Sequence, residues 1–320
     1  MNHIKDKTII VTGGFGFIGS KIVEILSNAN HDVRVMDNSE TYGVITKEDL
    51  KKLYEYRQRN WKNVYTFNGD VTNRDDVLRA FRSTPDVVIH LASYPRAKIV
   101  NANPMLGVRN IVEGTVNLLW HCDKFKTKKF VFISSSMIYG HYADGTAEDG
   151  DSKPNNLYGE SKLVAERFTK HYHTHNGVEY NIVRPSGVYG PGDMDDRVLS
   201  KFFAKAMANQ TIEVHDGSNK VDFTYVDDTA NGIVKCALGI ENNKSFNITA
   251  GNAISLRDAA ERIIALTGSK SKIVDIGMNK MYPRRGTLDI DRAKKLLGYK
   301  PETTFNEGLK KYYEWLRNKV

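Results

Sequence analysis

A glycine-rich stretch near the N-terminus constrains the fold more than any other feature of the sequence. Residues 8–26 read TIIVTGGFGFIGSKIVEIL, in which four glycines separate a β-branched run from an amphipathic helical pattern. A strand that ends in a glycine turn and opens into a helix directs free backbone amides and the positive end of the helix dipole toward one point. A pyrophosphate suits that point, and we expect glycine there because a side chain would stand where the phosphates approach.

The spacing of these glycines predicts a dinucleotide site. Gly13, Gly16 and Gly19 follow the first expected strand directly, and Asp37 ends the second expected strand eighteen residues after Gly19. A carboxylate at that place can hold an adenosine ribose and would repel a 2′-phosphate. Because the two residues after Asp37 add no arginine, the sequence favours NAD over NADP, although Arg34 is close by in the sequence.

Short β-rich segments alternate with longer helical patterns through the first half of the chain. The expected strands begin at Thr8, Asp32, Asn63, Asp86, Lys129 and Tyr180. Several of these segments are almost wholly apolar, which is typical of a parallel sheet covered on both faces. We therefore predict an α/β fold with a doubly wound, Rossmann-type parallel sheet. After Pro185 the alternation becomes less regular.

Composition excludes several classes of protein. The 320 residues are 40% hydrophobic, contain no apolar run long enough to span a membrane, and begin with a polar segment unlike a signal peptide. Two cysteines are too few for a disulfide framework, so we expect a cytoplasmic protein. The formal net charge is +8, but no segment resembles a nucleic-acid module, and the basic stretch from Lys47 to Lys62 is expected to be a solvated helix.

The segment YGESK indicates chemistry. Tyr158 and Lys162 lie four residues apart in a helical pattern that runs to about His175, so they share one face of the helix. A tyrosine, with a pKa near ~10, is a weak base, and a nearby ammonium would stabilise its phenolate. Tyr158 could then take a proton from a hydroxyl whose hydride leaves for NAD. Ser135, at the end of an expected strand, could bind the same oxygen.

The order of the motifs resembles that of a known family. The chain carries, in sequence, TGGFGFIG, Asp37, GDV, HLA, NIVEGTVNLL, SSSMIYG, YGESK, RPSGVYGPG and DFTYVDD. This series resembles the extended short-chain dehydrogenase/reductases, and more narrowly the NAD-dependent sugar epimerase/dehydratase family, which includes UDP-galactose 4-epimerase. The resemblance implies a seven-stranded Rossmann-type domain, a smaller α/β domain that covers a nucleotide-diphosphate sugar, and a homodimer formed through two helices.

The resemblance also assigns roles to individual residues. Tyr158 becomes the catalytic base, Lys162 the residue that lowers its pKa and binds the nicotinamide ribose, and Ser135 the second hydroxyl of the proton relay. The residues expected to bind NAD, besides Tyr158 and Lys162, are Gly13, Gly16, Phe17, Ile18, Gly19, Asp37, Asn38, Asp70, Val71, Leu91, Ala92 and Asn110. The residues expected to bind the substrate are Ser136, Lys220, Arg284 and Arg285.

The residues that follow Ser135 limit which reactions of this kind the chain can catalyse. Sugar dehydratases of this kind carry an Asp-Glu pair where this chain has Ser136 and Met137, and the decarboxylases keep an acid at the second of these positions. Transient oxidation to a 4-keto sugar and re-reduction remains the simplest chemistry, which is that of a 4-epimerase. A 4-dehydrogenase or 4-ketoreductase would need the same residues. A dehydratase, a reductase of a non-sugar ketone and a non-catalytic NAD sensor are the further alternatives.

Other positions limit the substrate assignment or suggest structural roles. Many epimerases have an asparagine at the position of Gly187 and an arginine at that of Val221. The contacts to the diphosphate are therefore expected to differ from those in these epimerases. We expect no metal site, a structural role for His90, and packing roles for the tryptophans Trp61, Trp120 and Trp315. We predict an NAD-binding domain of residues 1–185 with about 223–245, and a nucleotide-sugar domain of residues 186–222 and 246–320.

Overall fold

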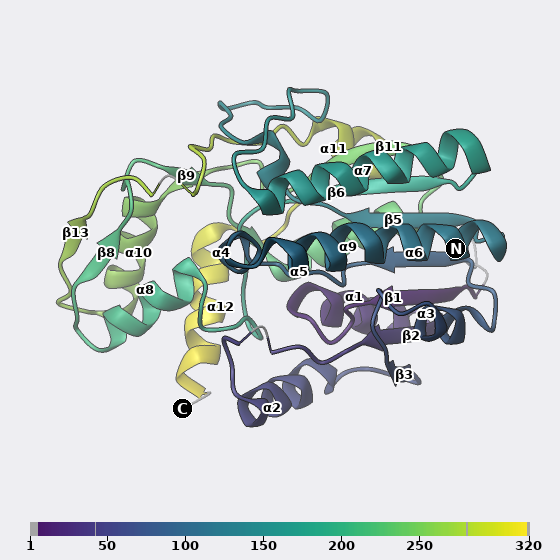
Figure 1. The fold of residues 1–320 in the computed structure, drawn as a ribbon. Coiled ribbons are helices and arrows are strands. Elements are labelled where there is room, and N and C mark those ends of the chain that lie inside the picture. The colour runs from purple at the N-terminus through teal and green to yellow at the C-terminus, as the bar shows by residue number, and fades with distance from the viewer. Residues whose placement is uncertain (1–5, 42, 280, 319–320) are drawn as a thin grey trace.

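The fold is built on a parallel sheet of seven strands. The computed structural model describes residues 6–41, 43–279 and 281–318. In the order β11-β6-β5-β4-β1-β2-β3, every neighbouring pair of strands is parallel (Figure 1). The strands are β1 (Thr8–Thr12), β2 (Asp32–Asp37), β3 (Tyr65–Asn68), β4 (Val87–His90), β5 (Lys129–Ile133), β6 (Tyr180–Pro185) and β11 (Lys244–Ile248). This order confirms the predicted doubly wound sheet.

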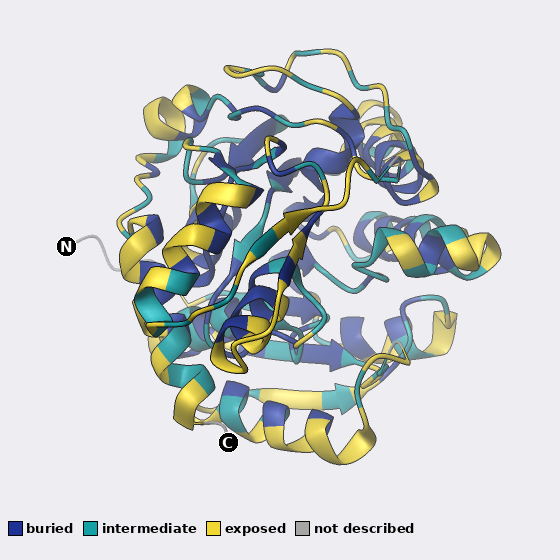
Figure 2. Ribbon diagram, turned by 90° about the vertical axis from the view of Figure 1, so that its left-hand side faces the viewer, coloured by how far each residue is buried: buried dark blue, intermediate teal, exposed yellow. Residues whose placement is uncertain are grey.

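Helices cover both faces of the sheet because side chains alternate along each strand. In β1, Ile9 and Val11 pack toward α1 (Phe17–Asn28), α9 (Val226–Leu238) and α11 (Asp291–Leu297). Ile10 points to the other face, toward α3 (Arg74–Phe81), α6 (Gly114–Lys124) and α7 (Leu157–Asn176). Figure 2 shows the buried residues gathered in the sheet and on the helix faces turned toward it. The result is three layers with one apolar core on each side of the sheet.

A smaller unit lies beside the sheet, at the left of Figure 1. Its helices are α8 (Val198–Met207), α10 (Leu256–Thr267) and α12 (Phe305–Asn318). Its short strands are β8 (Ile212–Val214) with β13 (Ile273–Asp275), and β9 (Lys220–Val221) with β12 (Ile254–Ser255). The pair β7 (Val188–Tyr189) and β10 (Thr224–Tyr225) shares its aromatic core. The predicted boundary between residues 245 and 246 falls within β11, a strand of the large sheet; the division into two domains stays a prediction.

Short helices connect the remaining segments. They are α2 (Lys47–Gln58), α4 (Ala97–Ala102), α5 (Pro104–Val108), the π-helical turn η1 (Arg109–Glu113) and the 3₁₀ turn η2 (Ser136–Tyr139). The predicted solvated helix at Lys47–Lys62 ends earlier than expected, and it buries Arg57, which donates to the carbonyl oxygens of Gly192 and Phe15. The α2 helix therefore holds the glycine turn against the segment that follows β7.

The tryptophan prediction is correct at two of its three positions. Trp61 stacks on Phe15 with ring centroids 5.7 Å apart and donates to the carbonyl oxygen of Ser20, and Trp315 packs against Tyr312. The prediction is wrong for Trp120, because its position on α6 faces away from the sheet and leaves the side chain 37% exposed.

A buried ion pair joins the sheet to α7. Arg184 at the end of β6 donates to both carboxylate oxygens of Glu166, at 3.0 and 2.7 Å, and both side chains are almost fully buried. The same guanidinium donates to Tyr139 Oη and to the carbonyl oxygen of Glu148. Tyr139 Oη donates in turn to Asn247 Oδ1 in β11. One guanidinium thus connects β6, α7, η2 and, through Tyr139, β11.

Replacing Glu166 with alanine leaves the Arg184 guanidinium buried without its carboxylate. We expect the free energy of unfolding to fall by about 3–5 kcal/mol, as for other buried ion pairs that lose one partner. Urea unfolding followed by circular dichroism measures this change. Lys170→Ala, an exposed substitution on the same helix, should change the same free energy by less than about 0.5 kcal/mol. Equal values for the two variants would contradict the assignment.

Candidate active site

The candidate site lies along the edge where the parallel strands end. Because all seven strands run the same way, their carboxyl ends meet at one edge of the sheet, where ligands of such folds bind. The glycine turn follows β1, Asp37 ends β2, Asp70 follows β3, Ala92 follows β4 and Ser135 follows β5. The topology therefore brings together residues that the sequence spreads over more than a hundred positions.

The glycine turn is fixed by the protein's own backbone. Gly13 has φ +72°, donates to the carbonyl oxygen of Met36 at 2.8 Å, and would place a Cβ 2.8 Å from the backbone nitrogen of Ala92. A Cβ on Gly14 would lie 2.7 Å from Cγ1 of Val35, and one on Gly19 would enter the carbonyl group of Gly13. The expected reason for these glycines, room for phosphates, is thus incomplete: the close approach of the turn to β2, to the segment after β4 and to α1 already requires them.

The turn still offers an anion site. Gly16 precedes α1 without a side-chain cap, and no acidic residue stands in the first turn of that helix. The first amides of a helix, here at Phe17 and Ile18, have no intrahelical acceptor and carry the positive end of the dipole. This arrangement fits a dinucleotide pyrophosphate.

The carboxylate of Asp37, at the end of β2, is held in place by backbone amides. It accepts hydrogen bonds from the backbone amides of Phe15 (3.0 Å) and Ser39 (2.8 Å). Burial raises the pKa of Asp37, while these two amides lower it. Arg34 is turned away from the site, since its guanidinium pairs with Asp32 at 2.8 Å and donates to Ser83. No arginine of this strand is therefore left to attract a 2′-phosphate, which agrees with NAD.

The remaining residues predicted to bind NAD continue along the same edge. Asn38 Nδ2 donates to Asp70 Oδ2 at 3.2 Å, and Asp70 Oδ1 accepts from the backbone and the hydroxyl of Thr72. Val71 is buried after β3, and the Leu91 amide donates to the Thr12 carbonyl oxygen. Asn110, in the π-helical turn, has a buried Oδ1 with no hydrogen-bond partner among the described residues. That oxygen fits a donor from a bound cofactor.

Ser135, Tyr158 and Lys162 come together from two elements. Ser135 follows β5 and accepts from the Met137 amide at 3.2 Å. Tyr158 is the second residue of α7, a helix that Asn156 caps by accepting from the Gly159 amide at 2.9 Å. Lys162 Nζ lies one turn later, 6.0 Å from the centre of the Tyr158 ring, and donates to the Ile133 carbonyl oxygen at 2.8 Å. All three side chains are at most 9% exposed.

The charges around Tyr158 differ from the sequence prediction. Burial raises the pKa of Tyr158, and the groups that lower it are the nearby Ser135 hydroxyl and the guanidinium groups of Arg197 and Arg96. Burial lowers the pKa of Lys162 to about 7, against the opposing effect of Glu166. We expected Lys162 to lower the pKa of Tyr158. In the structure burial raises that pKa, and Ser135 and the two arginines, rather than the lysine, oppose the increase. The sequence could not show how deeply both groups are buried.

His90 has the structural role that was predicted. Its two ring nitrogens bond the hydroxyls of Thr12, at 2.7 Å, and Thr115, at 3.1 Å. Complete burial lowers the pKa of His90 to about 3, so the ring is neutral at physiological pH. The neutral ring forms two hydrogen bonds that join β1, β4 and α6, and it takes no part in proton transfer.

The residues predicted to bind the substrate separate into two groups. Lys220 pairs with Asp144 at 2.9 Å and Arg284 with Asp216 at 3.5 Å, and both cationic side chains are exposed. Arg285 instead has a buried Nε without a hydrogen-bond partner among the described residues. Burial lowers its pKa, and the nearby Tyr142 opposes this change. Only Arg285 of the three cations is placed like a ligand-binding group.

A polar cluster surrounds Arg285. Burial raises the pKa of Tyr142, while Arg285 and the hydroxyls of Ser186 and Ser136 lower it. The oxygens of Tyr142 and Ser186 are buried, and within the described chain neither forms a hydrogen bond of good geometry. Unsatisfied buried polar atoms are costly, so several in one place indicate a site that a polar ligand completes. The sequence predicted Ser136 as a substrate-binding residue. It did not indicate Tyr142 or Ser186, because no spacing pattern marks them.

Arg197 and Asp193 were also missed. Both lie in the segment between β7 and α8, and each has a buried polar atom, Nε and Oδ2, without a partner among the described residues. Arg197 acts electrostatically on Tyr158, and Arg96 comes from the loop after β4. Nothing in the sequence marks these residues, since only tertiary packing brings them to α7.

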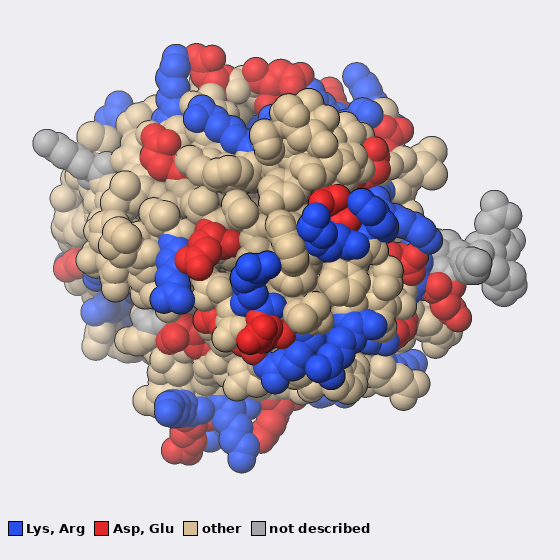
Figure 3. All heavy atoms as spheres, turned by 45° about the vertical axis from the view of Figure 1, so that its right-hand side comes forward, with Lys and Arg blue, Asp and Glu red and all other residues tan. Residues whose placement is uncertain are grey.

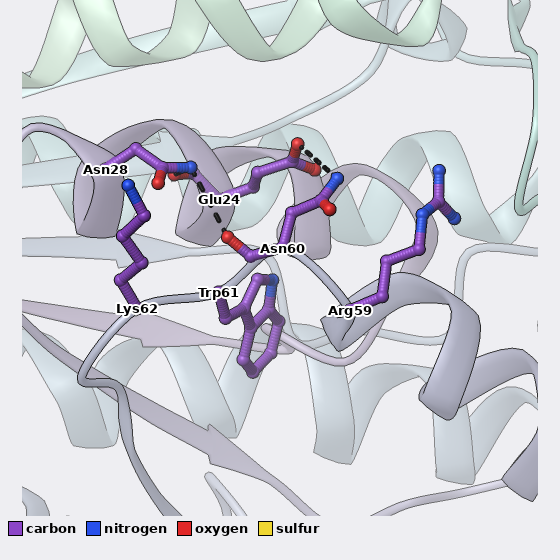
Figure 4. A pocket seen from close by; sticks show the side chains of 6 residues that line it. All are labelled: Glu24, Asn28, Arg59, Asn60, Trp61 and Lys62. Carbon is purple, nitrogen blue, oxygen red and sulfur yellow. Dashed lines mark hydrogen bonds between the residues drawn. The ribbon is translucent and has the colours of Figure 1, made fainter.

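A surface pocket lies elsewhere, on the later half of α1. Glu24, Asn28, Arg59, Asn60, Trp61 and Lys62 line it (Figure 4). Asn60 Nδ2 donates to Glu24 Oε1 at 3.0 Å, and Asn28 Nδ2 donates to the Asn60 carbonyl oxygen. Since α1 begins at the glycine turn, its later half lies toward the opposite edge of the sheet. Because the lining residues hydrogen-bond to one another, we assign them a structural role.

Neither the surface charge on one face of the molecule nor the metal-ligating side chains of the described residues indicate a second site. On the face in Figure 3, Lys and Arg side chains are interspersed with Asp and Glu. In the part of the chain that the structure describes, no three His, Cys, Asp or Glu residues are grouped to hold a metal ion. No helix among the described residues has the length and apolar character needed to cross a membrane.

Comparison with known proteins gives consistent results. A family model described as the NAD dependent epimerase/dehydratase family matches residues 9–249. A UDP-glucuronate 4-epimerase of Thermodesulfobacterium geofontis is 31% identical, over 97% of this chain and 96% of the relative. The UDP-glucuronic acid decarboxylase 3 of Arabidopsis thaliana is 30% identical, over 94% of this chain and 86% of its own.

A solved structure agrees in fold. The UDP-glucuronic acid 4-epimerase of Bacillus cereus, solved with UDP-glucuronic acid and NAD, superposes with a TM-score of 0.90 at 26% identity and covers 98% of this chain and 99% of its own. The matched region includes the glycine turn, Asp37, Ser135, Tyr158 and Lys162. The chain therefore belongs to the NAD-dependent epimerase/dehydratase family, as an epimerase with NAD as its cofactor.

Proposed function

We propose that the enzyme inverts C4 of a UDP-linked hexose by oxidation to the 4-ketone and reduction from the other face. The observation that carries this proposal is the buried set of Ser135, Tyr158 and Lys162 beside Met137, a residue without a proton to give or accept. Relatives that act on UDP-sugars at C4 support the choice of nucleotide and carbon.

Each residue of the set has one task. Tyr158 removes the proton of the 4-hydroxyl and later returns it, and the nearby Ser135 hydroxyl donates to the same oxygen. Lys162, fixed by its bond to the Ile133 carbonyl oxygen, is placed to bind the nicotinamide ribose. When bound, NAD supplies the acceptor and donor of the hydride. Because the same residues can serve either face of the 4-keto sugar, rotating that intermediate in the site is enough to invert C4.

The residue at position 137 separates this reaction from its neighbours. Eliminating water, or epimerising the carbon beside the ketone, needs a second acid or base next to the sugar. Met137 is 8% exposed and lies in η2, directly after Ser135 and Ser136, with a thioether that cannot transfer a proton. A 4-dehydrogenase or 4-ketoreductase would use the same residues but would consume or release NADH, which an epimerase does not.

Replacing Tyr158 with phenylalanine tests the base. We expect kcat to fall by about 10²–10⁴-fold with little change in the Michaelis constant, because the variant lacks only the proton-transfer group. Proton NMR of a UDP-hexose in deuterated water measures turnover, and the wild-type product should carry no deuterium. Tyr172→Phe, which removes a hydroxyl farther along α7, is the matched control. Deuterium in the product, or accumulating NADH, would contradict the proposed reaction.

Arg285 is proposed to hold the diphosphate. Its buried Nε, which lies near Tyr142 and has no hydrogen-bond partner in the described part of the chain, suits a phosphate oxygen, whereas Arg284 is 69% exposed and pairs with Asp216.

We expect Arg285→Ala to raise the Michaelis constant for the UDP-hexose about tenfold or more, since a charge-assisted hydrogen bond is lost. Steady-state kinetics and NAD titration measure the two affinities, and that for NAD should not change. Arg284→Ala is the neighbouring control. A wild-type Michaelis constant for Arg285→Ala would show that the diphosphate is held elsewhere.

The enzyme is further proposed to be a homodimer formed through α6 and α7. Val112, Val116 and Trp120 form one outward stripe at helical spacing, and Leu157, Val164 and Phe168 form another. Trp120, Leu157 and Phe168 are each at least 37% exposed. The two helices are neighbours on the same face of the sheet, so their stripes offer one apolar surface to a second copy.

Placing charges on this surface should produce a monomer. We expect Trp120→Glu combined with Phe168→Glu to halve the mass measured by light scattering after size exclusion, because two carboxylates would be buried in the interface. Ile240→Glu, at a site 93% exposed in the loop before β11, should leave the mass unchanged. A monomeric wild-type protein would refute the dimer.

A further inference from the structure

We propose that Arg57, near the end of α2, is a positioning residue that couples the binding of NAD to the binding of the nucleotide sugar. Its side chain connects the glycine turn to the segment of residues 190–197, which joins β7 to α8 and is called the connecting segment below. The inference rests on the proposed function, because it takes the smaller unit as the part of the chain that meets the nucleotide sugar.

Arg57 is buried on a helix whose other charged residues are exposed. It is 6% exposed, and it shares one face of α2 with the buried side chains of Leu50 and Leu53. A cation in that position loses its contact with water, and this loss is costly unless the protein satisfies its donors. The role of Arg57 therefore depends on the groups that its guanidinium meets inside the protein.

The guanidinium donates to backbone carbonyl oxygens of two segments. Nη1 lies 2.8 Å from the carbonyl oxygen of Phe15, in the glycine turn. Nε and Nη2 lie 3.0 and 2.7 Å from the carbonyl oxygen of Gly192, in the connecting segment. Because the donors of a guanidinium point in fixed directions, one planar group fixes the position of one backbone segment relative to the other.

The first of these segments belongs to the candidate cofactor site. Phe15 directly precedes Gly16, the residue before α1, and its amide donates to Asp37 Oδ2 at 3.0 Å. Its carbonyl oxygen accepts from Arg57, and its ring lies 5.0 Å from that of Tyr54 on α2. Phe15 is thus bound on one side by the carboxylate expected to hold a ribose and on the other side by α2.

The connecting segment is shaped to meet α2. Gly192 has φ +89°, and a Cβ there would lie 3.2 Å from Cε1 of Tyr56. Glycine therefore permits both this backbone conformation and the close approach. Two residues later, Met194 packs with Leu50 and Leu53 in one buried cluster. The contact with α2 thus combines hydrogen bonds and apolar packing.

The same segment borders the candidate active site. Asp196 pairs with Arg96, which comes from the loop after β4, with Nε 2.5 Å from Oδ2. Asp193 Oδ2 and Arg197 Nε are buried, and neither atom has a hydrogen-bond partner among the described residues. Because folded chains normally pair such atoms, the connecting segment is suited to being completed by a ligand. Directly after Arg197 the chain enters α8 of the smaller unit.

The hydrogen bonds of Arg57 give a physical route for coupling. A ligand that orders the glycine turn also restricts the connecting segment, because both carbonyl oxygens bind the same guanidinium. Ordering a segment costs conformational entropy, and less of this cost remains when a second ligand binds to a segment that is already ordered. Each ligand should therefore raise the affinity for the other by the same factor.

Calorimetric titration with NAD, with and without saturating UDP, tests this coupling. We expect UDP to raise the affinity of the wild-type protein for NAD about tenfold, and we expect Arg57→Met to bring this factor close to one because methionine has no donor. Arg59→Met, which removes an exposed guanidinium directly after α2, is the matched control and should keep the wild-type factor. An unchanged factor in Arg57→Met, or independent binding in the wild type, would overturn the proposal.

Hydrogen exchange locates the effect without turnover. NAD alone should slow amide exchange in peptides that cover residues 190–197 of the wild-type protein, and this protection should be lost in Arg57→Met. Equal protection in both proteins would mean that NAD acts on the connecting segment by another route, and would overturn the proposal. If Arg57→Met does not fold, Arg57→Lys keeps the charge without the planar fork and should give a smaller factor. A wild-type factor in Arg57→Lys would contradict the connection through two carbonyl oxygens.

This inference and the proposed reaction can fail separately. Normal epimerisation of a UDP-hexose by a protein that binds NAD and UDP independently would refute the coupling and keep the reaction. Coupled binding that depends on Arg57, in a protein that inverts C4 of no UDP-hexose, would keep the coupling and refute the reaction.

Discussion

The rest of the structure depends on the buried pair of Arg184 and Glu166. It fixes α7 to the end of β6, and α7 carries Tyr158 and Lys162 on the side that faces Ser135. Through Tyr139 and the Glu148 carbonyl oxygen the same guanidinium reaches η2 and the loop beyond it. Glu166 also opposes the lowering of the Lys162 pKa by burial, so the pair affects the position of the lysine and, in part, its charge. One ion pair thus holds α7 against the sheet and also acts on the lysine of the candidate site.

Near the candidate site lie several buried polar atoms that have no hydrogen-bond partner among the described residues. They include Asn110 Oδ1, Tyr142 Oη, Ser186 Oγ, Arg197 Nε and Arg285 Nε. A folded chain normally pairs such atoms, so we propose that cofactor and substrate supply part of the hydrogen bonding at this edge. Binding then stabilises the fold as well as the ligand.

The sequence predicted the features that arise from local patterns. The alternation of segments gave the sheet, glycine spacing and Asp37 gave NAD, and the order of the motifs gave the family, all of which are confirmed. The structural role of His90 is confirmed as well. What the sequence did not show depends on burial and on distant contacts. The balance of charges at Tyr158, the surface positions of Lys220 and Arg284, and the presence of Arg197 all result from packing between segments that no periodicity connects.

The glycine turn has a consequence for how such motifs evolve. Gly13, Gly14 and Gly19 are required by the closeness of the turn to β2, to the segment after β4 and to α1, whether or not a dinucleotide is bound. A descendant that had lost its cofactor would still be under selection to keep all three, because larger residues would disrupt the domain itself. Persistence of the glycines is then a consequence of folding and does not by itself show that a cofactor is still used.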